Sequence, residues 1–308
     1  MLVNYRRELG KPVHRIKFWY GYPLTPRLLF LLVFWSVLLG GTAHAGGRIL
    51  ATGGVTEIEG AAGGGIVPWA LISGYGTRDE IGATAFYTHL DIKDFRLQSA
   101  GVGVGIYDRG EITFARQKLG LGTTVPGESI EQDVVGIKLK LTGDAVFDQD
   151  GWLPQLALGV QYKRNRDFDL VPKLLGAKHG TGADVYLSAT KVFLAGVAGR
   201  NLLLNGTLRA TKANQLGLLG FGGDKNDSYR ARFEGSAAVF LNDALALGVE
   251  YRAKPDNLSV FREDRFLDVF LAYLPNKHLA LTAAYARLGT IADKNDQNAV
   301  YLSVQSGF

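Results

Sequence analysis

Residues 244–254 read ALALGVEYRAK, and this stretch alternates strictly between two kinds of side chain. The odd positions from Leu245 to Tyr251 are apolar, whereas the even positions are small or charged, as at Glu250 and Arg252. A period of two is typical of a β-strand whose two faces meet different surroundings. The stretch is also about as long as the 9–11 residues that a tilted strand needs to cross a bilayer. It therefore predicts a membrane-crossing strand with one lipid-facing side.

Similar segments follow one another from about residue 66 to the end of the chain. Their inward faces are rich in small residues, and tyrosines lie on the apolar faces near the segment ends, as expected for an aromatic girdle at headgroup level. A soluble β-sandwich also alternates, but it accounts for neither the segment length nor this girdle. We therefore predict an all-β fold, a transmembrane antiparallel up-and-down β-barrel. The girdle tyrosines are Tyr162, Tyr229, Tyr251, Tyr273 and Tyr285.

The number of strands depends on how residues 46–79 are interpreted. These residues are rich in glycine and contain Pro68, both of which weaken strand interiors. They form either a first hairpin, which gives 14 strands, or a lumen segment, which leaves 12; we favour 14. Both counts are even, so both ends of the barrel chain lie on the periplasmic side. The segments expected are 48–58, 66–76, 80–90, 95–107, 110–118, 131–142, 153–164, 182–193, 200–211, 228–241, 244–254, 264–274, 278–288 and 297–308.

Residues 1–45 have the three parts of a cleavable signal peptide. A cationic region is followed by the apolar run 28–39 and by Ala43 and Ala45, which form an A-x-A cleavage pattern. The apolar run is shorter than the roughly 20 residues that a transmembrane helix needs. Six of the 34 basic residues but one of the 29 acidic ones lie in this region, so the barrel, residues 46–308, is neutral overall. The net charge of +5 therefore does not indicate a nucleic-acid partner.

The glycine-rich stretch ILATGGVTEIEGAAGGGIVPWALISGYGT at 49–77, followed by FYTHLD at 86–91, resembles a proteobacterial domain-of-unknown-function family described as outer-membrane β-barrels. The resemblance is best over residues 49–120 and extends over the rest of the barrel region. It implies location in the outer membrane of a Gram-negative bacterium. It implies no activity and no site residues.

The residue types that commonly form metal sites or catalytic sites are scattered in this chain. The three histidines of the barrel region, His89, His179 and His278, are far apart, and the chain has no cysteine, so we expect no metal site and no cofactor. Ser99 and His89 lie on neighbouring predicted strands, but we expect Ser99 to face inward among glycines. We therefore predict no catalytic residue and no enzyme activity. The glycines at 101, 103 and 105 are expected to leave room for another group in the lumen.

Charged side chains at inward positions are the most informative set. They form either a pore wall that selects small anions or an ion-pair lattice that braces neighbouring strands. A turn at Asn242 that pairs Leu241 with Leu245 sets Glu234 opposite Arg252. Arg230 and Arg232 then have no acidic partner on that neighbour, and Arg209 lies on the strand beyond. Unless Asp268 or a loop carboxylate neutralises them, they form a positive stripe along one wall. The ten inward charges are Lys138, Lys140, Lys163, Arg209, Arg230, Arg232, Glu234, Glu250, Arg252 and Asp268.

The function expected from the sequence is a channel or transporter for small hydrophilic solutes. The alternatives are a plugged barrel with a structural or envelope-interaction role and a lipid-modifying enzyme. The partners expected are outer-membrane lipid and the assembly machinery, which would read the terminal strand ending in Phe308. We also expect Leu247→Arg on the lipid face to be costly and Gly248→Ser on the inward face to be tolerated.

Overall fold

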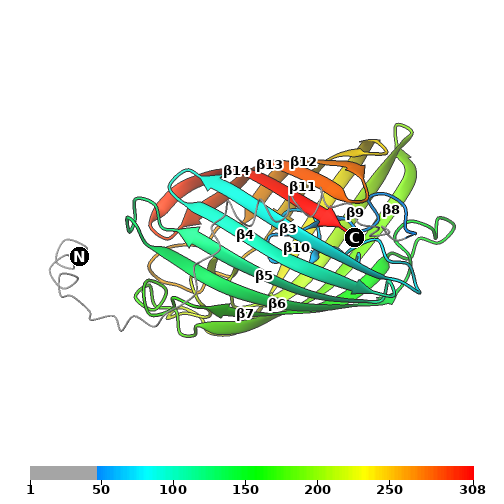
Figure 1. Ribbon diagram of the computed structural model, residues 1–308. Coiled ribbons are helices and arrows are strands. Elements are labelled where there is room, and N and C mark those ends of the chain that lie inside the picture. Colours follow the sequence, from blue (N-terminus) through cyan, green and yellow to red (C-terminus); the bar gives the residue numbers. More distant parts are fainter. Residues whose placement is uncertain (1–46) are drawn as a thin grey trace, which may run out of the picture.

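Strands β3 to β14 form one closed antiparallel barrel in the computed structural model, which describes residues 47–308 (Figure 1). No helix in this range is long and apolar enough to cross a membrane. The barrel strands are β3 (Ile81–Ile92), β4 (Arg96–Ile106), β5 (Gly110–Gly120), β6 (Ser129–Thr142), β7 (Gln155–Asn165), β8 (Thr181–Val197), β9 (Arg200–Thr211), β10 (Arg230–Asn242), β11 (Leu245–Arg252), β12 (Phe266–Asn276), β13 (Leu279–Ile291) and β14 (Lys294–Gly307).

Side chains alternate between the inside and the outside of the barrel along these strands. On β5, Glu111 and Thr113 are buried inside, whereas Ile112 and Phe114 point outward and are 51% and 40% exposed. The outward residues of the other strands are largely apolar too, for example Leu247 and Val269. Closure pairs the backbone groups of every strand, and the apolar exterior suits lipid. The fold is therefore that of an outer-membrane β-barrel.

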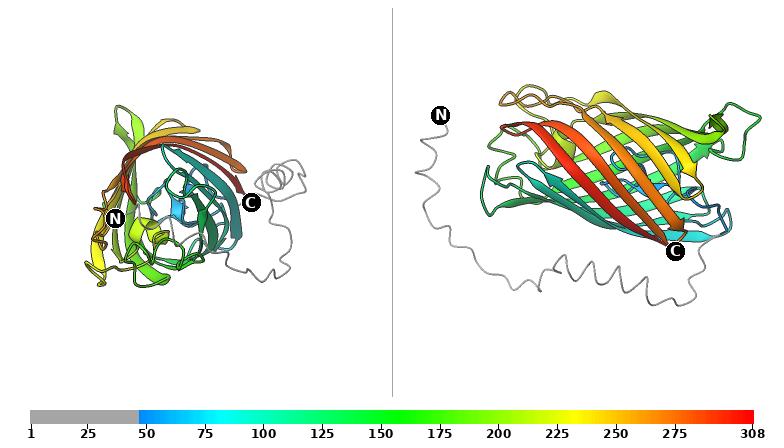
Figure 2. Two further views of the ribbon diagram at one scale, coloured as in Figure 1. Left: turned by 90° about the vertical axis from the view of Figure 1, so that its left-hand side faces the viewer. Right: turned by 90° about the horizontal axis from the view of Figure 1, so that it is seen from above.

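The barrel has 12 strands, so the favoured count of 14 is wrong. Strand β14 pairs directly with β3, with Gly307 opposite Thr84, and no sheet edge is left for a further hairpin. Residues 52–76 lie inside the barrel instead, and each of them is buried (Figure 2). We call residues 52–76 the plug.

Glycine explains why the plug forms no spanning hairpin. Gly54, Gly60 and Gly74 have φ values of +66°, +104° and +79°, which extended strands do not adopt. The only strands within the plug are β1 (Val55–Thr56) and β2 (Ala62–Gly63), which pair with each other. A segment buried on all sides also has no lipid-facing side, so the period of two is lost.

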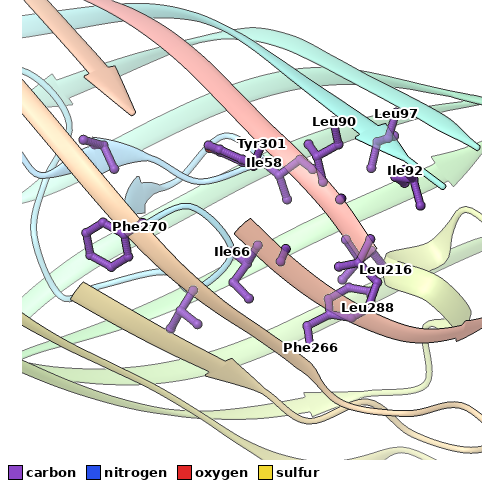
Figure 3. Close-up of a cluster of buried hydrophobic side chains, with 14 of the residues drawn as sticks. Ile58, Ile66, Leu90, Ile92, Leu97, Leu216, Phe266, Phe270, Leu288 and Tyr301 are labelled. Atoms are coloured by element: carbon purple, nitrogen blue, oxygen red, sulfur yellow. The ribbon is translucent and has the colours of Figure 1, made fainter. Parts of the chain in front are cut away.

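A second segment closes the barrel from the loop end. Residues 213–223, called the cap here, are buried and contain the 3-10 helix η2 (Asn214–Gly217). Leu216 of the cap lines one small apolar space together with Ile58 and Ile66 of the plug and with apolar side chains of the wall (Figure 3). The apolar cavity left between plug and cap is only about 30 Å³. Plug and cap together therefore fill the cross-section of the barrel.

The expected signal peptide, residues 1–45 with Ala43 and Ala45, lies outside the described residues 47–308. Cleavage before Gly46 stays a prediction.

Phe308 follows the closing strand. Its backbone N–H donates to the carbonyl of Ala83 at 2.9 Å, and its own carbonyl accepts from the N–H of Ala83 at 3.0 Å. We propose that this terminal residue is read during assembly, and we expect Phe308→Ser to slow the appearance of folded, heat-modifiable protein in outer membranes. Equal assembly of Phe308→Ser and wild type would contradict this role.

Candidate functional site

Glu59 of the plug meets three cations of the barrel wall. Its carboxylate forms an ion pair with Lys163 of β7. Its Oε2 lies 2.7 Å from Nη2 of Arg252 on β11 and 3.8 Å from Nη1 of Arg209 on β9. None of these side chains is more than 3% exposed. The cations come from alternate strands of the wall and converge on one carboxylate of the plug.

Three further carboxylates complete the cluster. Oδ2 of Asp184 lies 2.6 Å from Nζ of Lys163. Oε1 of Glu234 lies 2.6 Å from Nε of Arg209 and 3.2 Å from Nε of Arg252. Glu57 of the plug approaches Nη1 of Arg252 at 3.6 Å and accepts a hydrogen bond from Gln161 at 2.6 Å. In such a buried cluster, removal of one of the three cations would leave carboxylates without compensation.

The wall also satisfies the irregular backbone of the plug. Oε2 of Glu250 accepts the N–H groups of Gly65 and Ile66 at 2.7 and 2.8 Å. Nζ of Lys138 donates to the carbonyls of Ala62 and Leu71 at 2.9 and 2.7 Å. Buried backbone groups outside regular structure need such partners. The inward charges of the wall thus hold the plug as well as one another.

Glycines of the wall let the plug come close, as expected for the inward glycines of β4. A Cβ added at Gly105 would lie 2.0 Å from the carbonyl oxygen of Ser73, and one at Gly103 would lie 3.0 Å from its Oγ. Ser73 in turn donates its N–H and its hydroxyl to Glu111, both at 2.8 Å. The last turn of the plug therefore packs directly against the glycines of β4.

Gly64 of the plug offers a sharp test of this fit. A Cβ at Gly64 would lie 2.0 Å from Oε1 of Glu250. We expect Gly64→Ala to weaken seating of the plug by about 1–3 kcal/mol, the usual cost of overpacking. Brief conducting events in planar bilayers should then become more frequent. Gly206→Ala is the control, since its Cβ would meet nothing nearer than 3.7 Å. Equal recordings from both variants would mean that Gly64 is not constrained by Glu250.

The structure brings most of the predicted inward charges together. Lys138, Lys163, Arg209, Glu234, Glu250, Arg252 and Asp268 are buried in the lumen. Lys140 lies nearer the turn end of the barrel and pairs with Asp108 of the β4–β5 turn at 2.8 Å. Arg230, at the start of β10, is exposed and donates to Asn226 at 3.1 Å. Arg232 is partly buried.

The predicted strand register is confirmed, because Glu234 lies opposite Arg252. Leu241 does not pair with Leu245, however, since a bulge sets Asn242 opposite Leu245 instead. The continuous positive stripe is also wrong. Arg209 is paired with Glu234 and Asp184, so only Arg230 and Arg232 remain of it, at the loop end.

The structure separates Ser99 from His89. Ser99 points inward and donates its hydroxyl to the carbonyl of Ile58 at 2.7 Å. Its register partner is Thr88, so His89, the next residue along β3, points to the other face of the wall. A Ser-His pair therefore does not form here. Among residues 47–308, no group of three or more His, Asp or Glu side chains is placed to hold a metal ion.

An ion pair in the loop between β11 and β12 anchors the cap. Glu263 accepts the backbone N–H of Gln215 at 3.0 Å, and its Oε2 lies 3.5 Å from Nζ of Lys254. Burial raises the pKa of Glu263 to about 7, although Lys254 opposes this shift. Burial likewise lowers the pKa of Lys254 to about 8, against the effect of Glu263. The cap is thus fixed to a loop rather than only to the wall.

Sequence reasoning missed the plug carboxylates Glu57 and Glu59. A usable signal was present, because two glutamates separated by Ile58 stand in a segment that is otherwise apolar and glycine-rich. Charge in such a segment needs a buried partner. The inward cations of the wall were the partners available.

Residues 52–305 match the family described as "Protein of unknown function (DUF3034)", and the chain belongs to this family. No curated protein matches the chain. Among solved structures, the chain is similar to the KdgM porin (10% identity, TM-score 0.46, covering 73% of this chain and 99% of that one). It is also similar to the NanC porin (11%, 0.46, 73% and 98%) and to an outer membrane channel from Pseudomonas putida F1 (9%, 0.43, 79% and 97%).

Proposed function

We propose that the protein is an outer-membrane channel for small anionic solutes, closed at rest by its own plug. The observation that carries the proposal is the convergence of Lys163, Arg209 and Arg252 on Glu59. A carboxylate of the chain occupies the place that a carboxylate or phosphate of a solute would take.

Displacement of the plug would change the charge of the lumen. At the level of Glu59, the three cations would then have only Asp184 and Glu234 as direct partners, because Glu57 and Glu59 leave with the plug. This leaves a local surplus of one positive charge, while Glu250 and Asp268 carry negative charge elsewhere on the wall. A local surplus of positive charge in a narrow pore attracts anions. An anionic solute that competes with Glu59 would therefore favour the open barrel.

The turn end of the barrel leaves space beside the first residues of the plug. Hollows of about 380 and 580 Å³ flank residues 49–52. These hollows give the plug room for movement toward the periplasmic end. The contacts at the centre are mostly ionic and hydrogen-bonded, and water or a solute could replace them.

One observation favours the alternative of a permanently plugged, structural barrel. The carbonyl of Pro68 accepts hydrogen bonds from Thr207 at 2.8 Å and from Ser188 at 3.2 Å. Ala70 is held as well, by Thr190 and Gln155. Such dense anchoring would suit a plug that never leaves.

A reversible disulfide between the plug and the wall distinguishes the two functions. The chain has no cysteine, and Cβ of Ser73 lies 3.4 Å from the position of a Cβ at Gly103. This separation is close to the roughly 3.5–4.5 Å found in disulfides. Ser73→Cys/Gly103→Cys should therefore tie the plug to β4 on oxidation and release it on reduction, with Ser73→Cys alone as the control.

We expect planar bilayers with the double variant to be silent when it is oxidised and to show openings when it is reduced. The reversal potential under a salt gradient should indicate that the open channel is selective for anions. Silence in both states, with wild type also silent, would support the structural barrel. Equal conductance in both states, or cation selectivity, would contradict the gated anion channel.

A further inference from the structure

A hollow of about 820 Å³ opens at the loop end of the wall, between the β11–β12 loop and the β13–β14 hairpin. Arg262, Arg265 and Arg287 line it, and all three are exposed. Within residues 47–308, none of these guanidinium groups forms an ion pair or a side-chain hydrogen bond. The hollow is therefore a concave surface with free hydrogen-bond donors.

Two acidic residues of this hollow remain against its three arginines. Glu263 is buried against Lys254, whereas Asp264 accepts only the neutral backbone N–H of Thr290 at 3.1 Å and keeps its charge. Asp296 is the other lining acid. The three arginines therefore exceed the two free acids by one positive charge.

The wall beside the arginines faces lipid. Register places Tyr251, Leu267 and Arg287 in one row across β11, β12 and β13. Tyr285 lies two residues below Arg287 on the same outward face, about 7 Å along the strand. Because tyrosines of such barrels lie at headgroup level, Arg287 stands where lipid phosphates meet the wall.

We propose that this hollow binds the phosphate groups of an outer-leaflet glycolipid such as lipopolysaccharide. Arg262, Arg265 and Arg287 hold the phosphates, since guanidinium groups bind phosphate oxygens in a bidentate manner. The acyl chains lie along Tyr251, Leu267 and Tyr285. The short turns at the opposite end of the barrel face the periplasm, so this hollow belongs to the outer leaflet.

Another sector of the wall provides a natural comparison. Arg116 and Arg166 also point outward at the loop end, but both pair with Asp133, at 2.7 and 3.4 Å. Arg164 stands opposite Asp133 in the strand register. Arg116 and Arg166 share this carboxylate and Arg164 lies next to it on the neighbouring strand, whereas the arginines of the hollow have no such partner within the described part of the chain. The binding site is therefore confined to one side of the barrel.

The test is a titration of the full-length protein in detergent with lipopolysaccharide, read by native mass spectrometry. Arg262→Gln/Arg265→Gln/Arg287→Gln is compared with the matched control Arg116→Gln/Arg164→Gln/Arg166→Gln. We expect the first variant to bind about tenfold more weakly, a change of about 1.4 kcal/mol, and the control to bind as wild type does. Dephosphorylated lipid should bind the wild type as weakly as intact lipid binds the first variant.

Three outcomes would overturn the proposal. Unchanged affinity of the first variant would remove the arginines from binding. An equal loss in both variants would mean general attraction by surface charge rather than a site. Full competition by inorganic phosphate at equal concentration would mean that the hollow takes free phosphate and has no specific place for a lipid.

Discussion

Glu59→Gln is expected to increase the fraction of open barrels by about 10–10²-fold. Glu59 contacts Lys163, Arg209 and Arg252, and its neutral replacement leaves these three cations against the three carboxylates of Asp184, Glu234 and Glu57. The charges of the cluster stay balanced, but buried charged groups of the wall lose their direct partner in the plug, which costs about 1–3 kcal/mol. Each 1.4 kcal/mol corresponds to a factor of ten, and the displaced state, with the cations hydrated, loses little.

Single-channel recording in planar bilayers measures this effect as open probability. Glu128→Gln is the control, because Glu128 is exposed in the β5–β6 loop and the substitution is chemically the same. The heat-modifiable shift on gels shows whether each variant is folded. A folded Glu59→Gln barrel with the open probability of wild type would mean that the ion-pair cluster does not hold the plug.

Leu247→Arg should lower the free energy of unfolding in lipid vesicles by about 2–4 kcal/mol, the cost of a cation at the bilayer midplane. Leu247 points outward and is 45% exposed. On β11 it lies between Tyr251 toward the loop end and Leu245, which pairs with Tyr273, toward the turn end. Tyr251 and Tyr273 mark the two interfaces here, so Leu247 lies between them, near mid-depth.

Ile81→Arg is the matched control for Leu247→Arg. Ile81 is outward too, but it begins β3 at the turn end, where an arginine should cost about 0–1 kcal/mol. Urea unfolding from vesicles compares the two variants. Equal losses at both positions would contradict the assignment of depth along the wall.

Gly248→Ser cannot serve as the tolerated inward substitution that the alternation suggested. A Cβ at Gly248 would lie 2.4 Å from Cζ of Phe270 and 2.7 Å from the carbonyl oxygen of Ala237. The period of two correctly predicted that this position faces inward. It could not predict that the aromatic ring of the neighbouring strand fills the space.

The local alternation of side chains was sufficient to predict the wall of this barrel. Alternation over residues 244–254 predicts one spanning strand, and its charges predict the pairing of Glu234 with Arg252 across a turn. Both features depend on residues that are close in sequence. The free-energy penalty for charge in lipid keeps the charged residues on the inner face of each strand and the apolar residues on the outer face. For the same reason, the inward positions of Lys163, Arg209 and Asp268 could be predicted.

The contents of the lumen were decided only by closure of the barrel. Glu59 is 104 residues from Lys163 and 193 from Arg252, and no local period relates them. The glycine-rich segment fits a first hairpin by length, but pairing of β14 with β3 leaves it no edge. Inside the barrel, its carboxylates Glu57 and Glu59 then contact the wall cations Lys163, Arg209 and Arg252. An ion pair of this kind forms only once the strands surround it, because Glu59 lies between the two short strands β1 and β2, where no side-chain period indicates a partner.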